Sequence, residues 1–91
     1  MKIFYKASFL KAFEKLDHAE QELVQKADSL IRRYFKTSQA PFGLRIKQLK
    51  NNTYEARIND RLRMVWVKTN NEASFALLGN HEDVLRYIKN T

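Results

Sequence analysis

The spacing of the apolar residues changes after the loop that ends at Gly43, and this change limits the possible folds most strongly. Before the loop, apolar residues recur every three or four positions, which is the period of a helix with one buried side. After it, apolar and polar residues alternate, which is the period of a strand. Helices separated in this way from a run of neighbouring antiparallel strands predict an α+β fold.

Each expected element can be placed from this pattern and from the turn-forming residues between the apolar segments. Two helices are expected over residues 9–16 and 18–36, and the segment Thr37–Gly43, which holds the one proline of the chain, is expected to be a loop. A short helix is expected after Gly79. Strands are expected in five segments, residues 1–6, 44–49, 54–58, 61–68 and 73–78, with asparagine-containing turns between the last four.

Short polar side chains are expected to start the helices, because they can accept hydrogen bonds from the free backbone N–H groups there. Ser8 is expected to cap the helix over 9–16. Asp17, followed three residues later by Glu20, resembles a capping box and is expected to start the helix over 18–36. Almost no linker separates these two helices, so they should fold back as a helical hairpin. Asn80 or His81 is expected to cap the last helix.

The length of 91 residues predicts one domain over residues 1–91. With 44% hydrophobic residues, such a chain can form one modest core, and wholesale disorder is not expected. The expected architecture is a small antiparallel sheet with an N-terminal helical hairpin and a short C-terminal helix.

Composition argues against several classes of site. Without cysteine, no disulfide, thiolate zinc site or cysteine nucleophile is expected, and this absence suits a reducing cytoplasm. The two histidines and the scattered acids show no metal-ligand spacing, and the two glycines are isolated, so neither a metal nor a nucleotide cofactor is expected. No apolar segment is long enough to span a membrane, and no signal peptide is visible.

Basic residues are concentrated in one part of the chain. Of the formal net charge of +7, most lies in residues 44–70, which hold seven Lys or Arg and two acids. A basic patch on strands points to a polyanion, most often a nucleic acid, although a solvated sheet face is the open alternative. The side chains expected to contact RNA are those of Arg45, Lys47, Lys50 and Arg61.

Arg57 and Arg63 lie in consecutive strands across the short turn at Asn59 and Asp60, so antiparallel pairing brings them close together. Two guanidinium groups repel unless an anion lies between them, and the planar guanidinium matches the oxygens of a phosphate diester. Two alternatives stay open: Arg57 faces solvent, or Arg63 pairs with an acid such as Asp60 or Glu55.

His81 directly follows the last strand and is a candidate general base, and Tyr87, six residues later, is a candidate acid or stacking group. The alternatives are a capping or surface histidine and a core tyrosine. His18 lies on a charged stretch and is expected to be exposed. Together with two arginines, these groups suffice for metal-free RNA cleavage, because RNA supplies its own 2′-hydroxyl nucleophile.

The order of the elements and the C-terminal half resemble the RelE/ParE superfamily of type II toxin–antitoxin toxins, over nearly the whole chain. The segments that carry this resemblance are Lys2–Lys6, the helical hairpin, Tyr54–Ile58, Arg61–Trp66 and Leu77–Val84. The last segment is similar to the Gly-x-His-x-Asp junction of YafQ-like toxins. The resemblance implies a small antiparallel sheet with a helical hairpin, and a toxin that cleaves mRNA in the ribosome without a metal.

By this resemblance, Arg63 matches the arginine used at the scissile phosphate, Arg57 a basic position of the preceding strand, and His81 the general-base histidine of YafQ-like toxins. Tyr87 matches a C-terminal aromatic residue of RelE. The sequence departs from RelE at Glu55, where RelE has a basic residue; a glutamate serves as the base in the YoeB-like branch.

The resemblance leaves three functions open: a ribosome-dependent mRNA endonuclease, a ParE-like inhibitor of DNA gyrase, and an inactive toxin-fold protein that binds an antitoxin. All three imply a cognate antitoxin protein as a partner, and the first also implies the ribosome and mRNA. The fold, the chemistry and the expected cytoplasmic location require neither a metal nor a membrane.

Overall fold

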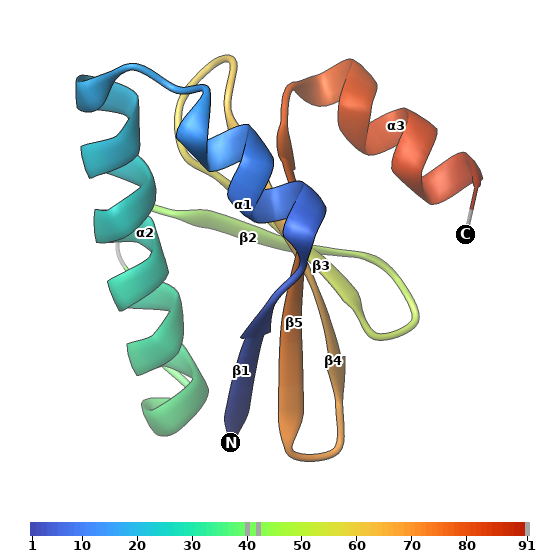
Figure 1. Cartoon of the computed structure of the whole chain (residues 1–91). Helices are drawn as coiled ribbons and strands as arrows, with labels where there is room; N and C mark the ends of the chain where they lie inside the picture. The colour runs from blue at the N-terminus through green and yellow to red at the C-terminus, as the bar shows by residue number, and fades with distance from the viewer. Residues whose placement is uncertain (40, 42, 91) are drawn as a thin grey trace.

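In a computed structural model, described for residues 1–39, 41 and 43–90, the chain forms one sheet and three helices (Figure 1). The elements follow in the order β1 (Lys2–Tyr5), α1 (Ala7–Glu14), α2 (His18–Thr37), β2 (Arg45–Lys50), β3 (Thr53–Arg57), β4 (Arg63–Thr69), β5 (Glu72–Gly79) and α3 (His81–Lys89). This is the expected order, and the α+β class is confirmed. Among the described residues, no helix is both long and apolar enough to cross a membrane.

The sheet has the order β1-β5-β4-β3-β2, and it is mixed rather than purely antiparallel. Strands β2 to β5 form consecutive antiparallel pairs, as expected. Strand β1 instead pairs in parallel with β5, with Lys2 opposite Glu72 and Tyr5 opposite Phe75. The expectation of an all-antiparallel sheet is therefore wrong at this edge. Alternation shows which residues form a strand, but it does not show which neighbour the strand joins or in which direction.

The helix starts follow the expected signals in part. Asp17 caps α2, since its carboxylate accepts a hydrogen bond from the backbone N–H of Glu20 at 2.8 Å. Ser8 does not cap α1, which begins at Ala7 after Lys6 without a side-chain cap. The Ser8 hydroxyl donates instead to the carbonyl oxygen of Ala76 at 3.1 Å. This bond ties α1 to β5, so a tertiary contact replaces the local one that the sequence pattern suggested.

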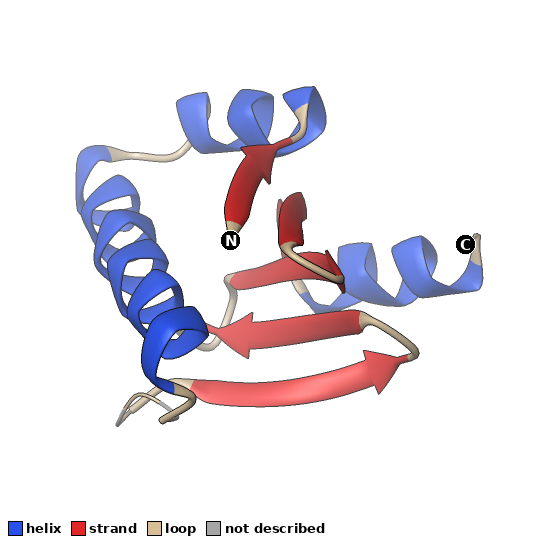
Figure 2. Ribbon diagram, turned by 90° about the horizontal axis from the view of Figure 1, so that it is seen from below, coloured by secondary structure: helices blue, strands red, loops and turns tan. Residues whose placement is uncertain are grey.

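The main core lies between α1, α2 and one face of the sheet. Phe9 of α1 and Ile31 of α2 are buried, as are Met64, Trp66 and Phe75 of the central strands. The rings of Phe9, Trp66 and Phe75 lie 5.8–5.9 Å apart in tilted pairs. Figures 1 and 2 show α2 on one side of the strands and α3 on the other. We call the sheet face that α1 and α2 leave uncovered the open face.

A polar cluster connects the first strand to α2. The Tyr5 hydroxyl donates to Asp28 at 2.5 Å and accepts from Arg32 at 2.7 Å, and the Arg32 guanidinium lies over the Tyr5 ring. Burial, followed by the hydrogen bond to Asp28, raises the pKa of Tyr5 above its ordinary value. The cluster fixes the short edge strand β1 against the helix that covers it.

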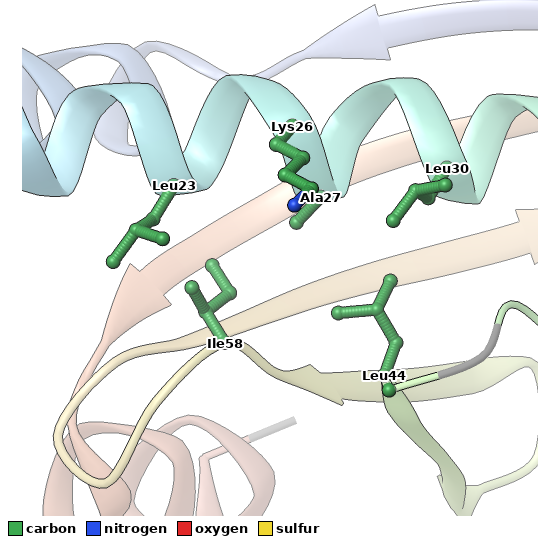
Figure 3. Close-up of a pocket in the computed structure, with 7 residues that line it drawn as sticks. Leu23, Lys26, Ala27, Leu30, Leu44 and Ile58 are labelled. Carbon is green, nitrogen blue, oxygen red and sulfur yellow. The ribbon is translucent and has the colours of Figure 1, made fainter.

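Helix α2 covers the sheet incompletely near the start of β2. Leu23, Ala27 and Leu30 of α2 face Leu44 and Ile58 across a cavity of about 190 Å³ (Figure 3). Leu23 is 42% exposed, so this apolar contact is open to solvent at one end.

Helix α3 begins with a complete capping box. The side chain of Asn80 accepts from the backbone N–H of Asp83, and the Asp83 carboxylate accepts from the backbone N–H of Asn80, both at 2.9 Å. This confirms the first of the two expected caps, Asn80. The helix contacts β4 and β5 and buries Val84, while Val65, on the open face of β4, is completely buried outside the main core. Helix α3 therefore lies over part of the open face.

Candidate functional site

Three arginines lie side by side in one row across the sheet. Arg45 pairs with Arg57 between β2 and β3, and Arg57 pairs with Arg63 between β3 and β4. In β5 the row ends at Gly79, which pairs with Arg63. The core residues Ala56 and Met64 alternate with these arginines along their strands, so Arg57 and Arg63 belong to the open face. We call Arg45, Arg57 and Arg63 the arginine row.

Arg63 is the buried member of the row and makes an ion pair with an acid of the next row. Its side chain is 11% exposed, and its Nε lies 3.5 Å from Oε1 of Glu55, whose side chain is 10% exposed. Pairing of Arg63 with an acid was one of the two alternatives, and Glu55 is that acid. The Nη1 atom of Arg63 is buried and has no hydrogen-bond partner among the described residues. An unsatisfied buried donor on a cation is costly, and this nitrogen can reach a further acceptor when the groups that cover it move.

Arg57 and Arg45 form the accessible part of the row. Arg57 is 37% exposed on its side chain and lies 3.8 Å from the carboxylate of Asp60, which is fully exposed. Such a long ion pair in solvent contributes little, so the guanidinium remains available. Both arginines line an open cavity of about 310 Å³ together with Gly43, Ile58, Asn59 and Asp60.

The other basic residues expected to bind RNA lie in different places. Lys47 is exposed and pairs with Glu55 across β2 and β3, one row away from the arginine row. Lys50 ends β2 beside the turn to β3. Arg61 lies in the turn between β3 and β4, and its guanidinium lies 3.7 Å from Glu20 of α2. Lys47 therefore lies on the same face of the sheet as the arginine row, whereas the guanidinium of Arg61 lies beside α2.

His81 and Tyr87 both lie in α3. His81 is the first residue of the helix and is exposed, two residues after the glycine that pairs with Arg63. Tyr87 is half-buried, two turns further along. Among the described residues, no hydrogen bond or ion pair joins either side chain to the arginine row. His18 is exposed, as expected, and its imidazole lies 2.8 Å from Glu22 on α2.

Asp83 is the acid of the Gly-x-His-x-Asp junction, to which the sequence pattern assigned no role of its own, and its carboxylate lies against Gly79 at the end of the arginine row. A Cβ atom added at Gly79 would lie 2.5 Å from Oδ2 of Asp83. Asp83 also accepts a hydrogen bond from Arg86 at 2.5 Å. The signal was present in the sequence, because Asn80 and Asp83 have the spacing of a capping box. It showed the start of a helix, but not that the glycine before it is needed for close packing.

No metal site is apparent in the part of the chain that the structure describes: no group of three or more His, Cys, Asp or Glu side chains lies close enough to hold an ion. The open face offers cations and one buried carboxylate, and α3, which lies over part of this face, carries an exposed imidazole and a half-buried phenol. This combination can bind an anion and move protons near it.

Comparisons with known proteins give matches at the level of structure. No family model and no curated protein sequence matches the chain. A YoeB/ParE toxin from Agrobacterium tumefaciens is similar with a TM-score of 0.69 and 22% identity, covering 89% of this chain and 99% of that chain. A YoeB dimer from Staphylococcus aureus gives 0.68 and 19%, covering 89% and 97%.

A third similar structure is a chain of a RelB–RelE antitoxin–toxin complex from Methanococcus jannaschii, with a TM-score of 0.66 and 14% identity, covering 92% of this chain and 96% of that chain. In all three cases the match spans almost the whole length of both chains, so the shared part includes the sheet and the helices around it. The protein therefore has the same fold as these YoeB/ParE and RelE structures.

Proposed function

We propose that this protein is the toxin of a type II toxin–antitoxin system, and that it cleaves mRNA on the ribosome by metal-free acid–base catalysis. The observation that carries the proposal is the arginine row, in which Arg63 keeps a buried guanidinium nitrogen without a partner beside the accessible Arg57. A phosphate diester offers the oxygens that such a row lacks. The toxin folds of the similar structures support the same reading.

In the proposed reaction, a base removes the proton of the 2′-hydroxyl, and the 2′-oxygen attacks the adjacent phosphorus. The bond from phosphorus to the 5′-oxygen breaks, and an acid protonates that oxygen. The products are a 2′,3′-cyclic phosphate and a 5′-hydroxyl. Arg63 and Arg57 stabilise the negative charge that develops on the phosphorane, which is the largest single contribution such a site can make.

The proton-transfer roles follow from the groups around the row. His81 or Glu55 acts as the base, and Tyr87 acts as the acid or stacks on a base of the substrate. Glu55 lies closer to the row because it pairs with Arg63. His81 is exposed at the start of α3 and is therefore free to approach a bound strand.

The proposed partners are the ribosome, mRNA and a cognate antitoxin. Arg45, Lys47, Lys50 and Arg61 would contact RNA through its phosphates, which makes binding strongly dependent on salt. The similar structure from Methanococcus jannaschii was solved as an antitoxin–toxin complex. An acidic antitoxin segment would neutralise the same basic surface of this chain.

The Glu55–Arg63 pair also favours a second candidate, an inactive toxin-fold protein that binds only an antitoxin. A carboxylate 3.5 Å from Arg63 occupies part of the site that a phosphate would use. In this case the fold would keep the antitoxin surface but lack nuclease activity. A ParE-like inhibitor of DNA gyrase would likewise leave mRNA intact, and it would be marked by a DNA-damage response.

The test is controlled expression in growing cells, with growth and protein synthesis measured for the wild type and for His81→Ala and Arg57→Gln. The proposal predicts arrest of translation by the wild type and relief by Arg57→Gln. Relief by His81→Ala as well identifies His81 as the base, and full toxicity of this variant identifies Glu55. His18→Ala and Arg33→Gln are the matched controls, because both residues are exposed on α2, and they should remain as toxic as the wild type. Arrest by all five proteins, or by none, would refute the proposed role of this site.

A further inference from the structure

A second pocket lies at the C-terminal end of α2, on the helical face of the sheet. It has a volume of about 100 Å³ and is lined by Tyr34, Phe35 and Ser38 of α2 and its end, by Tyr54 of β3, and by Trp66 and Lys68 of β4. Trp66 and Lys68 alternate with the open-face residues of β4, so the pocket lies on the opposite side of the sheet from the arginine row. We call it the aromatic pocket.

The walls of this pocket are four rings from three elements. The Tyr54 ring is stacked on Trp66 at 5.9 Å and 17°, and the Phe35 ring meets Trp66 edge-on at 5.9 Å and 71°. Tyr34 lies 6.2 Å from Phe35. Trp66 is only 1% exposed and forms the floor, whereas the other three rings are half-buried. Flat walls of this kind leave ring faces for a planar group to stack on.

The polar groups around the pocket have no partner among the residues that the structure describes. The hydroxyl groups of Tyr34, Tyr54 and Ser38 and the ammonium group of Lys68 make no hydrogen bond or ion pair with any described residue. Lys68 is the charged residue of the lining, and no described acid lines the pocket. A cationic ligand is therefore disfavoured, and a planar group that carries hydrogen-bond acceptors and a negative charge is favoured.

We propose that the aromatic pocket binds a nucleobase that carries a phosphate group, with the base between the rings of Tyr34 and Tyr54 and the phosphate on Lys68. Stacking on aromatic rings accepts any base, so the site selects a nucleotide rather than a sequence. The volume of about 100 Å³ is close to that of a nucleobase alone, so the sugar and the phosphate lie at the mouth of the pocket beside Lys68. The C-terminal end of α2 carries a partial negative charge, which would repel an anion. This repulsion is weak here, because the carbonyl of Tyr34 accepts a hydrogen bond from the backbone N–H of Ser38 and the positive Lys36 lies in the last turn.

This inference is independent of the proposed nuclease, because the pocket shares no residue with the open-face site. The nucleotide can come from a free mononucleotide or from a strand of RNA. In the second case the protein would hold RNA on both faces of its sheet.

Trp66 gives a direct assay, because it is the one tryptophan of the chain and it lines the pocket. The full-length protein is titrated with AMP, adenosine, ribose 5-phosphate and a short single-stranded RNA, and the tryptophan emission is followed. We expect a saturable change with AMP, a several-fold weaker one with adenosine, and none with ribose 5-phosphate. If the RNA binds more tightly than AMP, the nucleotide in the pocket belongs to a strand of RNA. If the two bind equally, it is a free mononucleotide.

Two variants tie the signal to the pocket. Tyr34→Leu should raise the Kd for AMP about tenfold, which is the scale of one stacking contact. Lys68→Gln should bring the Kd for AMP to that for adenosine and leave adenosine unchanged. Lys26→Gln, an exposed lysine of α2, is the control for all ligands, and Arg57→Gln, in the arginine row, is the control for AMP and adenosine only; both should bind these two ligands as the wild type does.

The inference is overturned if millimolar AMP and RNA leave the emission unchanged, or if Tyr34→Leu binds like the wild type. It is also overturned if Arg57→Gln removes the signal, because the nucleotide then lies on the arginine row. Thermal melting of each variant verifies folding. If Tyr34→Leu does not fold, Lys68→Gln is used instead, because it changes an exposed residue. Equal Kd values of Lys68→Gln for AMP and for adenosine support the proposal, and the wild-type difference between them overturns it.

Discussion

Replacing Gly79 by alanine is expected to destabilise the start of α3 through one neighbouring side chain. The added Cβ would lie 2.5 Å from Oδ2, 2.8 Å from Cβ and 3.0 Å from Cγ of Asp83. Carbon atoms do not approach this closely, so Asp83 must move, and its hydrogen bond to the backbone of Asn80 and its ion pair with Arg86 are lost. Both interactions hold the junction between β5 and α3, where His81 lies.

The magnitude follows from these contacts. Loss of the capping interaction costs about 1 kcal/mol, and the exposed ion pair adds about 0.3 kcal/mol. Crowding at the junction adds about 1 kcal/mol or more, while alanine gains roughly 0.5–1 kcal/mol over glycine within a strand. The expected net loss is about 1–2 kcal/mol in the free energy of unfolding, measured by urea denaturation, and it lowers the Tm by roughly 4–8 °C per kcal/mol.

A double-mutant cycle with Asp83→Gly tests the cause, because this change removes all three atoms that the new Cβ would meet. In the Asp83→Gly background, Gly79→Ala should be neutral or slightly stabilising. An equal loss of stability in both backgrounds would refute the reasoning, since the cost would then not arise from Asp83.

Three further predictions concern other contacts. Tyr5→Phe should destabilise the protein by about 1 kcal/mol through loss of the hydrogen bond to Asp28. The raised pKa of Tyr5 gives stability that is present below its ordinary value near 10.0 and lost as the pH rises through the folded-state pKa, so urea denaturation above pH 10 should show a smaller alkaline loss for Tyr5→Phe. Glu55→Met and Arg63→Met should each cost about 3 kcal/mol by leaving one charge buried, whereas the double variant should cost clearly less than their sum in the same assay; additive effects would contradict an energetic role for the pair. Arg57→Gln should reduce the slope of log K against log salt for single-stranded RNA by about 0.7, and an unchanged slope would mean that Arg57 contacts no phosphate.

The sequence was most informative where local rules determine the structure. The alternating segments placed four strands to within two residues, and the asparagines of the turns take positive φ at Asn52 and Asn70, as such turns require. The caps Asp17 and Asn80 could be predicted because each depends only on residues three positions apart. The closeness of Arg57 and Arg63 could also be predicted, because the turn between their strands is short and fixes the register of the two strands.

Long-range contacts could not be predicted from the sequence pattern. The parallel pairing of β1 with β5 joins segments about seventy residues apart, and the same distance separates Ser8 from the carbonyl that it binds. Arg45 joined the arginine row only through the register of β2 with β3. The burial of Glu55 could not be read from alternation either, because it depends on what covers the open face.

The central claim is that the arginine row holds an RNA phosphate for attack by the neighbouring 2′-hydroxyl. Its most direct test is the chemistry of the ends produced on a translated mRNA by the purified protein, with the cleavage sites mapped by primer extension. We expect fragments that end in a 2′,3′-cyclic phosphate and begin with a 5′-hydroxyl, formed by the wild type and not by Arg57→Gln. Intact mRNA, or fragments that begin with a 5′-phosphate, would mean that the arginine row does not support this reaction.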